Sequence, residues 1–236
     1  MKLGIERVLP QKIARVLASA LRHSQPVYIE LPRDMVRVPC EPVVAEAPAA
    51  IDEDALAACV DELLARLASA KSPVLMAGIE VRRFGLEDRV AELSRRLGLP
   101  VVTSFMGRGL LADADAPLVG TYMGVAGEPE LSRLVESSDG LLLLGEIVCD
   151  TNFAVSERKI DLRRTIQALD GQVKMGYHVY PDIPLAALVD RLLARVPATG
   201  RHFDVHRASF PRGMPADDAT IAPNDIATAI NDDGSP

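Results

Sequence analysis

The chain has 236 residues, of which 48% are hydrophobic and 25% are charged, so we expect one domain of ordinary size with flanking pieces and a sizeable buried core. The formal net charge of -7 argues against nucleic acid or an anionic membrane as a partner, because both need clustered Lys and Arg. No apolar run approaches the ~20 residues of a membrane span, and the first residues do not resemble a secretory signal. Three widely spaced cysteines argue against a disulfide framework or a zinc site and fit the reducing cytoplasm.

The opening of the chain predicts one helix followed by one short strand. Apolar residues between Ile13 and Leu21 recur at helical spacing, and the pattern stops at residues 23–26. Residues 27–31 then have the composition of a short strand, closed by Pro32. A helix and a strand of this size do not make a domain, so we expect the pair to dock on another part of the protein.

Helix and strand signals alternate from residue 52 onward. Asp52 is a plausible N-cap for a helix whose apolar face runs to Leu67. A later helix stops at Gly98, a typical residue after a helix end, and another starts at Pro129. Asp182 is expected to cap a further helix, and residues 224–231 begin the last one. The predicted strands cover residues 73–77, 100–103, 140–144, 164–169 and 173–176.

These strands are short and apolar without alternation, which is typical of strands buried on both faces. Together with the intervening helices they predict right-handed βαβ crossovers. The fold class is therefore α/β, a three-layer sandwich with a mostly parallel, doubly wound, Rossmann-like sheet.

Ligands of such sheets lie beyond the carboxyl ends of the strands. The predicted crevice there would be lined by Gly78, Met106, Gly107, Gly145 and Asp170. The glycines could let a backbone approach a ligand, or they could simply permit tight turns. Asp170 could hold a ribose, or it could be an ordinary turn residue.

The sequence motifs of common cofactor and metal sites are mostly absent. The first turn, residues 78–85, has bulky residues where G-x-G-x-x-G would have glycine, and the second strand ends at Ser104 rather than at an acid, so NAD is disfavoured. Asp150 and Asn152 offer oxygen ligands, but a single pair of this kind in a loop is a weak signal for a metal, and a capping role is the favoured explanation. His202 and His206 have metal-ligand spacing without a helical pattern. We therefore predict no catalytic residue and no metal ligand in this chain.

Four stretches carry a family resemblance: QPVYIELPRDMV at 25–36, and residues 72–111, 120–153 and 221–231. They resemble the thiamine diphosphate-dependent 2-keto acid decarboxylases, in particular the phenylpyruvate/indolepyruvate branch. The resemblance implies the following organisation. Residues 1–36 would be the end of the pyrimidine-binding domain, 37–51 a linker, 52–197 the central domain, 198–220 a second linker and 221–236 the start of the diphosphate-binding domain.

The resemblance also implies a carboxy-lyase that needs thiamine diphosphate and magnesium and converts indolepyruvate or phenylpyruvate to the aldehyde and carbon dioxide. The activating glutamate of the family belongs to a region that would precede Met1, and no Gly-Asp-Gly motif for the diphosphate and magnesium occurs. We therefore expect neither cofactor nor turnover in this chain alone. Its expected partners are the N- and C-terminal domains of the same enzyme, in a homodimer or homotetramer.

Two alternatives remain open at this point. The sheet could hold FAD or ADP as a nucleotide-binding module, because the central domain does so in some relatives. The chain could instead be a non-enzymatic assembly or regulatory domain, for which residues 27–31 and 226–230 would supply an exposed apolar patch.

Overall fold

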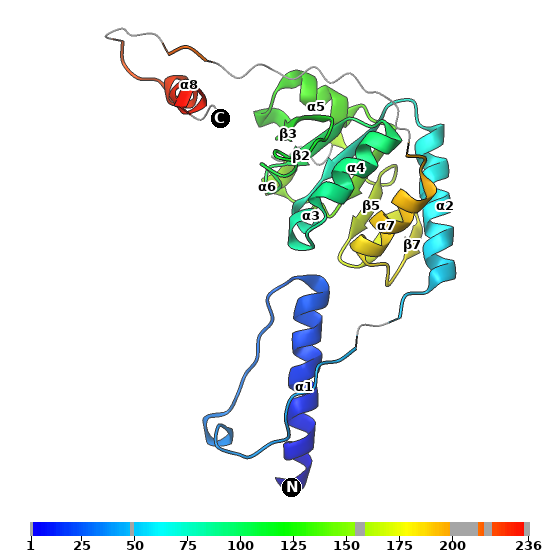
Figure 1. Cartoon of the computed structure of the whole chain (residues 1–236), viewed down its shortest axis with the longest axis vertical. Helices are drawn as coiled ribbons and strands as arrows, with labels where there is room; N and C mark the ends of the chain where they lie inside the picture. The colour runs from blue at the N-terminus through cyan, green and yellow to red at the C-terminus, as the bar shows by residue number, and fades with distance from the viewer. Residues whose placement is uncertain (1, 48–49, 154–158, 199–211, 215–218, 234–236) are drawn as a thin grey trace. The chain divides into compact units, whose positions relative to one another are not determined.

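The computed structural model of the chain describes residues 2–47, 50–153, 159–198, 212–214 and 219–233 (Figure 1). The chain forms two units, Met1–Val205 and His206–Pro236. The second unit contains helix α8, Pro223–Asp233, close to where the sequence predicts it. All other helices and strands belong to the first unit.

A seven-stranded sheet forms the centre of the first unit, in the order β3-β2-β1-β4-β5-β6-β7. The first five strands in this order pair in parallel, and β6 and β7 continue the sheet antiparallel. The prediction of a mostly parallel α/β sheet is thus confirmed. The strands are β1 Pro73–Ala77, β2 Val101–Ser104, β3 Leu118–Tyr122, β4 Gly140–Leu144, β5 Ile166–Leu169, β6 Gln172–Met175 and β7 His178–Tyr180.

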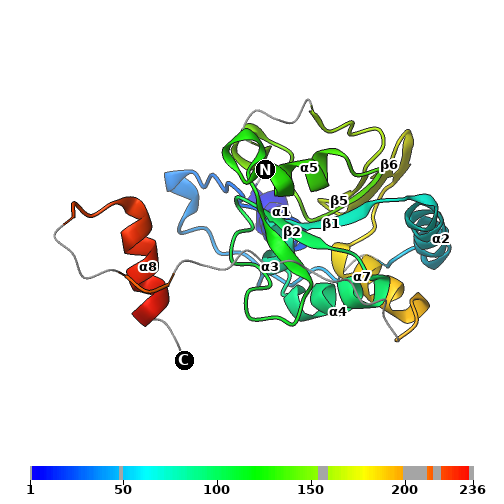
Figure 2. The ribbon, with the colours of Figure 1, turned by 90° about the horizontal axis from the view of Figure 1, so that it is seen from above.

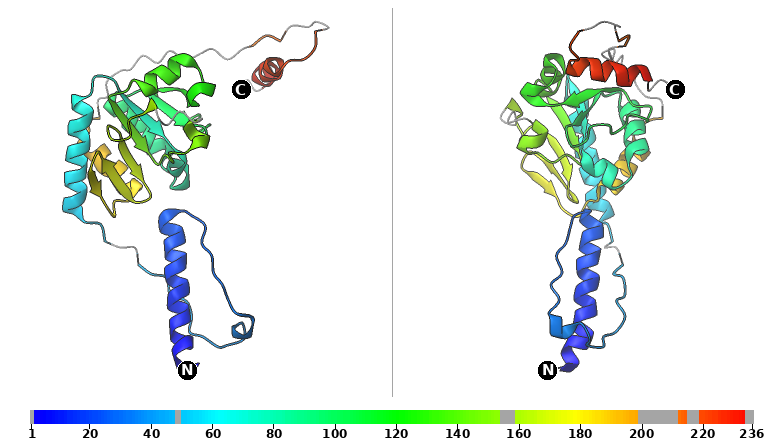
Figure 3. Two further views of the ribbon diagram at one scale, coloured as in Figure 1. Left: turned by 180° about the vertical axis from the view of Figure 1, so that it is seen from behind. Right: turned by 90° about the vertical axis from the view of Figure 1, so that its left-hand side faces the viewer.

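Helices cover both faces of the sheet. Figure 2 shows α4 and α7 on one side and α5 on the other, and Figure 3 shows the same layers from two further directions. In β1, Leu75 and Ala77 join the core under α4 and α7, whereas Val74 and Met76 join the core on the face of α5. The helices of this unit are α1 Lys2–His23, α2 Glu53–Ser69, α3 Ile79–Arg83, α4 Glu87–Leu97, α5 Pro129–Glu136, α6 Asp150–Phe153 and α7 Leu185–Arg195, with 3-10 turns at Arg33–Met35 and Gly124–Ala126.

Two predicted helix boundaries are confirmed in atomic detail. Asp52 caps α2, because its Oδ1 accepts hydrogen bonds from the N–H groups of Asp54 and Ala55 at 3.1 and 3.0 Å. Gly98 ends α4 in the left-handed conformation with φ of 65°. Among the described residues, no helix is long and apolar enough to cross a membrane.

Other local expectations are wrong. Residues 27–31 form no strand, because no described segment pairs with their backbone, and Tyr28 is 82% exposed. Asp182 does not cap α7: Pro184 precedes that helix, and Asp182 has φ of 56° and contacts Arg22. Strands β3 and β7 were not predicted from the sequence.

Candidate functional site

The part of the predicted crevice around Gly78 and Gly145 lies where β1 and β4 end, and the chain packs closely on itself there. A side chain at Gly78 would collide with the backbone of Gly145 and Glu146. Gly145 has φ of 63°, and a side chain there would meet Cβ of Glu80 at 2.6 Å. The two glycines therefore let the start of α3 pack directly against the end of β4, where the Glu80 N–H donates to the Gly145 carbonyl at 3.1 Å.

The Glu146 carboxylate is buried beside these glycines. Glu146 is 2% exposed, and neither of its carboxylate oxygens has a hydrogen-bond partner among the described residues. Burial raises the pKa of Glu146 to about 7, and the nearby polar groups of Ser104 and Asn152 offset only part of that rise. Neither group makes a hydrogen bond of ordinary geometry to the carboxylate. Below about pH 7 this carboxyl group is therefore mainly the neutral acid.

Asn152 ties together the loops that follow β2 and β4. Its Oδ1 accepts the Met106 N–H at 2.9 Å, and its Nδ2 donates to the Ile147 carbonyl at 2.7 Å. Beside it, the Gly107 N–H donates to Ser104 Oγ at 3.3 Å. Because the Asn152 amide is buried and makes these bonds at both ends, its observed contacts are structural.

Asp170 occupies the tip of the β5–β6 hairpin. Asp170 and Gly171 both have positive φ, 53° and 71°, as the tight turn between antiparallel strands requires. Its backbone N–H donates to Oε2 of Glu80 at 3.2 Å, and its Oδ1 lies 2.6 Å from Nδ1 of His23 at the end of α1. Asp170 thus connects the sheet to α1.

Glu80 is the buried group beneath that tip, 1% exposed. Burial raises the pKa of Glu80 above its usual range. The Asp170 N–H and the charges of Arg83 and His23 oppose the rise, whereas the Asp170 carboxylate adds to it. Unlike Glu146, this glutamate has a backbone donor for its carboxylate.

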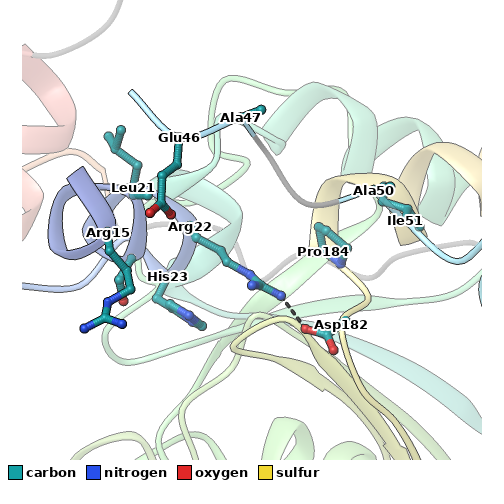
Figure 4. Close-up of a pocket in the computed structure, with 12 residues that line it drawn as sticks. Arg15, Leu21, Arg22, His23, Glu46, Ala47, Ala50, Ile51, Asp182 and Pro184 are labelled. Carbon is teal, nitrogen blue, oxygen red and sulfur yellow. Dashed lines mark hydrogen bonds and ion pairs between the residues drawn. The ribbon is translucent and has the colours of Figure 1, made fainter. Parts of the chain in front are cut away.

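A cavity of about 570 Å³ lies beside the end of α1 (Figure 4). Its lining combines the cationic side chains of Arg15 and Arg22 with the carboxylates of Glu46 and Asp182. Figure 4 shows Arg22 reaching across to Asp182, with which it forms an ion pair. The cavity is therefore bordered by charges that are partly paired with each other.

A second polar cluster joins α2 to β7, away from the strand ends. Glu62 accepts hydrogen bonds from Tyr180 Oη at 2.8 Å and Arg66 Nε at 2.9 Å, and Nδ1 of His178 lies 2.8 Å from it. Burial alone would raise the pKa of Glu62, but these three contacts lower it to about 2. The Glu62 carboxylate is thus paired within the cluster, and the cluster connects α2 to β7 at the edge of the sheet.

No metal site is formed by the described residues: no three His, Cys, Asp or Glu side chains converge. Asp150 is exposed, and His202 and His206 lie outside the described residues. The three cysteines are free thiols, with Cys59 buried, Cys149 half-buried and Cys40 exposed. The described residues therefore contain no cluster of side chains that fits the metal ion of thiamine diphosphate.

The structure thus brings Gly78 and Gly145 together, places Met106 and Gly107 at the neighbouring strand end, and uses Asp170 as a hairpin tip. Sequence reasoning did not single out Glu80 and Glu146, the two buried glutamates of this edge. Gly78 and Gly145 come directly after two buried strands, and Glu80 and Glu146 lie two residues and one residue after them, which is the sequence signal that could have drawn attention to both glutamates.

Comparison with known proteins identifies the family of this chain. Residues 60–196, more than half of the chain, match the model of the thiamine pyrophosphate enzyme central domain. The chain belongs to this family. The family resemblance noted in the sequence is therefore confirmed, and the seven-stranded, mostly parallel sheet is consistent with this central domain.

Curated relatives of this central domain are 2-keto acid decarboxylases by name. Indole-3-pyruvate decarboxylase of Azospirillum brasilense is 60% identical over 226 residues, which cover 94% of this chain and 41% of the relative. Pyruvate decarboxylase 3 of Arabidopsis thaliana is 31% identical over 214 residues, 87% of this chain and 36% of the relative. Pyruvate decarboxylase of Hanseniaspora uvarum is 24% identical over 218 residues, which cover 89% of this chain and 39% of the relative. The chain therefore spans about two fifths of the length of these relatives.

Proposed function

We propose that this chain is the central structural part of a thiamine diphosphate-dependent decarboxylase that acts on an aromatic 2-keto acid such as indolepyruvate or phenylpyruvate. The observation that carries the proposal is the 60% identity, over 226 residues, to an indole-3-pyruvate decarboxylase. In this reading the chain holds the two cofactor-binding domains in place and supplies no catalytic residue itself. The full enzyme is cytoplasmic, binds magnesium with its cofactor and works as a homo-oligomer.

The strand-end geometry supports a structural role over nucleotide binding. In a nucleotide-binding sheet, glycines at strand ends leave room for the ligand. Here Glu146 and the backbone of Gly145 occupy the space in front of Gly78. Asp170, the candidate ribose ligand, is engaged at the hairpin tip by His23.

A domain exchange tests the proposal directly. Residues 52–197 would replace the matching segment of the Azospirillum brasilense enzyme, and decarboxylation of indole-3-pyruvate would be measured. We expect the chimaera to retain activity, because a scaffold of the same family should seat the cofactor-binding domains correctly. A folded, oligomeric chimaera without activity would contradict the scaffold role.

The isolated chain offers the complementary test. Calorimetry with thiamine diphosphate and magnesium should detect no micromolar binding, and phenylpyruvate should not be decarboxylated, because the described residues form no metal site. Flavin fluorescence of the purified chain checks the nucleotide alternative. Bound flavin, or turnover by the chain alone, would overturn the proposal.

A further inference from the structure

Two loops at the carboxyl edge of the sheet are joined by one amide side chain. They are residues 105–109 after β2 and 146–149 after β4, and we call them the edge loops. Asn152 lies on α6, where its Oδ1 accepts the Met106 N–H at 2.9 Å and its Nδ2 donates to the Ile147 carbonyl at 2.7 Å. One side chain therefore holds both loops, and the contact between them depends on the orientation of that amide.

The carboxyl group of Glu146 is enclosed beside this amide. Two polar side chains, Ser104 and Asn152, are near enough to affect its pKa, yet neither carboxylate oxygen has a hydrogen-bond partner among the described residues. Ser104 Oγ accepts the Gly107 N–H at 3.3 Å, and the Asn152 donor is directed at Ile147. The polar side chains beside the carboxyl group thus hydrogen-bond to the edge loops instead.

The opposite side of Glu146 is closely packed backbone. A Cβ atom at Gly78 would lie 2.3 Å from both Cα of Glu146 and the carbonyl oxygen of Gly145. The Gly78 N–H also donates to the Leu144 carbonyl at 2.8 Å, which continues the pairing of β1 with β4. Because this side has no room to rearrange, a change around Glu146 must take place in the edge loops.

Charged and titratable groups surround Glu146 without pairing with it. They are Glu80, Arg82 and Arg83 on α3, Arg108 and Cys149 on the edge loops, Asp150 on α6, and Asp170 with His23 at the hairpin tip. Glu80 accepts the Asp170 N–H at 3.2 Å. Arg82 donates to the Gly109 carbonyl at 3.2 Å, so this end of the first edge loop has a support that does not involve Glu146. Burial is the main cause of the raised pKa of Glu146, and no charge among the described residues contributes to it.

An anion at this position needs donors that the neutral acid does not need. A buried carboxylate without hydrogen bonds is strongly unfavourable. The donors beside it are the Ser104 hydroxyl and the Asn152 amide. When Asn152 turns its amide to the carboxylate, it loses the Ile147 carbonyl and carries its acceptor oxygen away from the Met106 N–H. The proton of the acid passes to solvent, and the first edge loop loses its hydrogen bond at Met106.

We propose that Glu146 is a proton-dependent switch for the edge loops. The protonated acid leaves Asn152 to join the two loops, whereas the ionised carboxylate takes the Asn152 donor and frees the first loop at Met106. The side chain of Met106 lies at the surface, 37% exposed, so the opening begins there. This inference does not depend on the decarboxylase proposal, because it concerns contacts within one unit of the chain.

Native-state hydrogen exchange, followed by nuclear magnetic resonance, tests the switch in the full 236-residue chain. The Met106 amide reports opening of the first edge loop, and the amides of β4 report unfolding of the sheet. The exchange rate of an unstructured peptide at the same pH, divided by each measured rate, gives a protection factor. Measurements without urea and in low, non-denaturing urea separate the two events, because unfolding of the sheet exposes much more surface than a local opening does.

The protection factor of the Met106 amide should fall about tenfold between about pH 5.5 and about pH 7.5, and it should not change in low urea. The reason is that the pKa of Glu146 is about 7 in the closed form and returns toward its ordinary value of 4.5 once the carboxylate has donors. Glu146→Gln and Glu146→Met have no proton to lose at this position and should abolish the pH response. Glu130→Gln, on the exposed face of α5, is the matched control and should retain it.

Three results would overturn the proposal. The first is a Met106 protection factor that is the same at both pH values, and the second is a fall that persists in Glu146→Gln and Glu146→Met. The third is a urea dependence of Met106 exchange equal to that of the β4 amides, which would make the opening part of global unfolding. The first and third comparisons use the parent chain, so they hold even if a substitution prevents folding. None of these results bears on the decarboxylase proposal, which rests on the activity of the chimaera.

Discussion

Two glutamates at the same edge of the sheet are buried to the same degree but differ in their partners. Glu80 is 1% exposed and accepts the backbone N–H of Asp170. Glu146 is 2% exposed, and in the part of the chain that the structure describes neither of its carboxylate oxygens has a hydrogen-bond partner. Burial raises the pKa of both. The comparison shows two ways to place a carboxyl group inside a protein: donors can support its charge, or the group can keep its proton.

A carboxyl group placed in the middle of β4 should find no hydrogen-bond donors for its charge, and its burial there should be strongly unfavourable. Leu143 is 1% exposed and pairs with Met76 and Gln167 of the neighbouring strands. Leu143→Asp should unfold the domain, with a loss above about 4 kcal/mol, because it combines a lost core side chain with a buried charge. Far-UV circular dichroism and urea titration measure the loss. Tyr177→Asp, at a residue that is 88% exposed, is the matched control and should melt as the parent does.

Glu146 should make stability depend on pH. Its pKa rises from 4.5 to about 7 on folding, so the folded chain binds this proton more tightly than the unfolded chain between those values. The free energy of unfolding should therefore fall as the pH rises from 4.5 to about 7, by about 3 kcal/mol from this group, and level off above. Urea titrations across this range measure the slope.

Glu146→Gln mimics the neutral acid and should be more stable than the parent above neutral pH, with little difference in mild acid. Glu130→Gln, on the exposed face of α5, is the control for loss of a negative charge. Equal pH slopes for the parent and Glu146→Gln would show that the Glu146 carboxylate finds donors that its surroundings do not display.

Glu80 should show the smallest effect, one that depends on its hydrogen bond. Glu80→Leu leaves the Asp170 N–H without its acceptor and should cost about 2 kcal/mol. Glu80→Gln retains an acceptor oxygen and should lose less than half of that. Hydrogen exchange at the Asp170 amide adds a local measurement. If the leucine and glutamine variants were equally stable, the N–H to carboxylate bond would not be what makes this burial tolerable.

Regular parts of the fold were predictable because their signals are local. The apolar run of β4, the cap at Asp52 and the glycine at Gly98 each act within a few residues. The edge strands escaped prediction for physical reasons. In β3, Gly120 and Thr121 interrupt the apolar pattern, and β7 has only three residues, of which two are exposed.

The site was less predictable, because its chemistry depends on contacts between distant segments. Asp170 could be read as a turn residue, and its conformation supports that alternative. Its link to His23, however, spans 147 positions of the chain. Likewise, a glutamate after a strand looks exposed in sequence, and only the close approach of Gly78 to Gly145 shows why Glu146 is enclosed.

The antiparallel end of the sheet has a consequence for the behaviour of the chain in concentrated solution. A free sheet edge can recruit strands from other molecules and start aggregation. Here that edge is β7, which has only three residues and so offers few unpaired backbone groups to an incoming strand. Its brevity limits edge-to-edge polymerisation on this side, even though Val179 is half exposed.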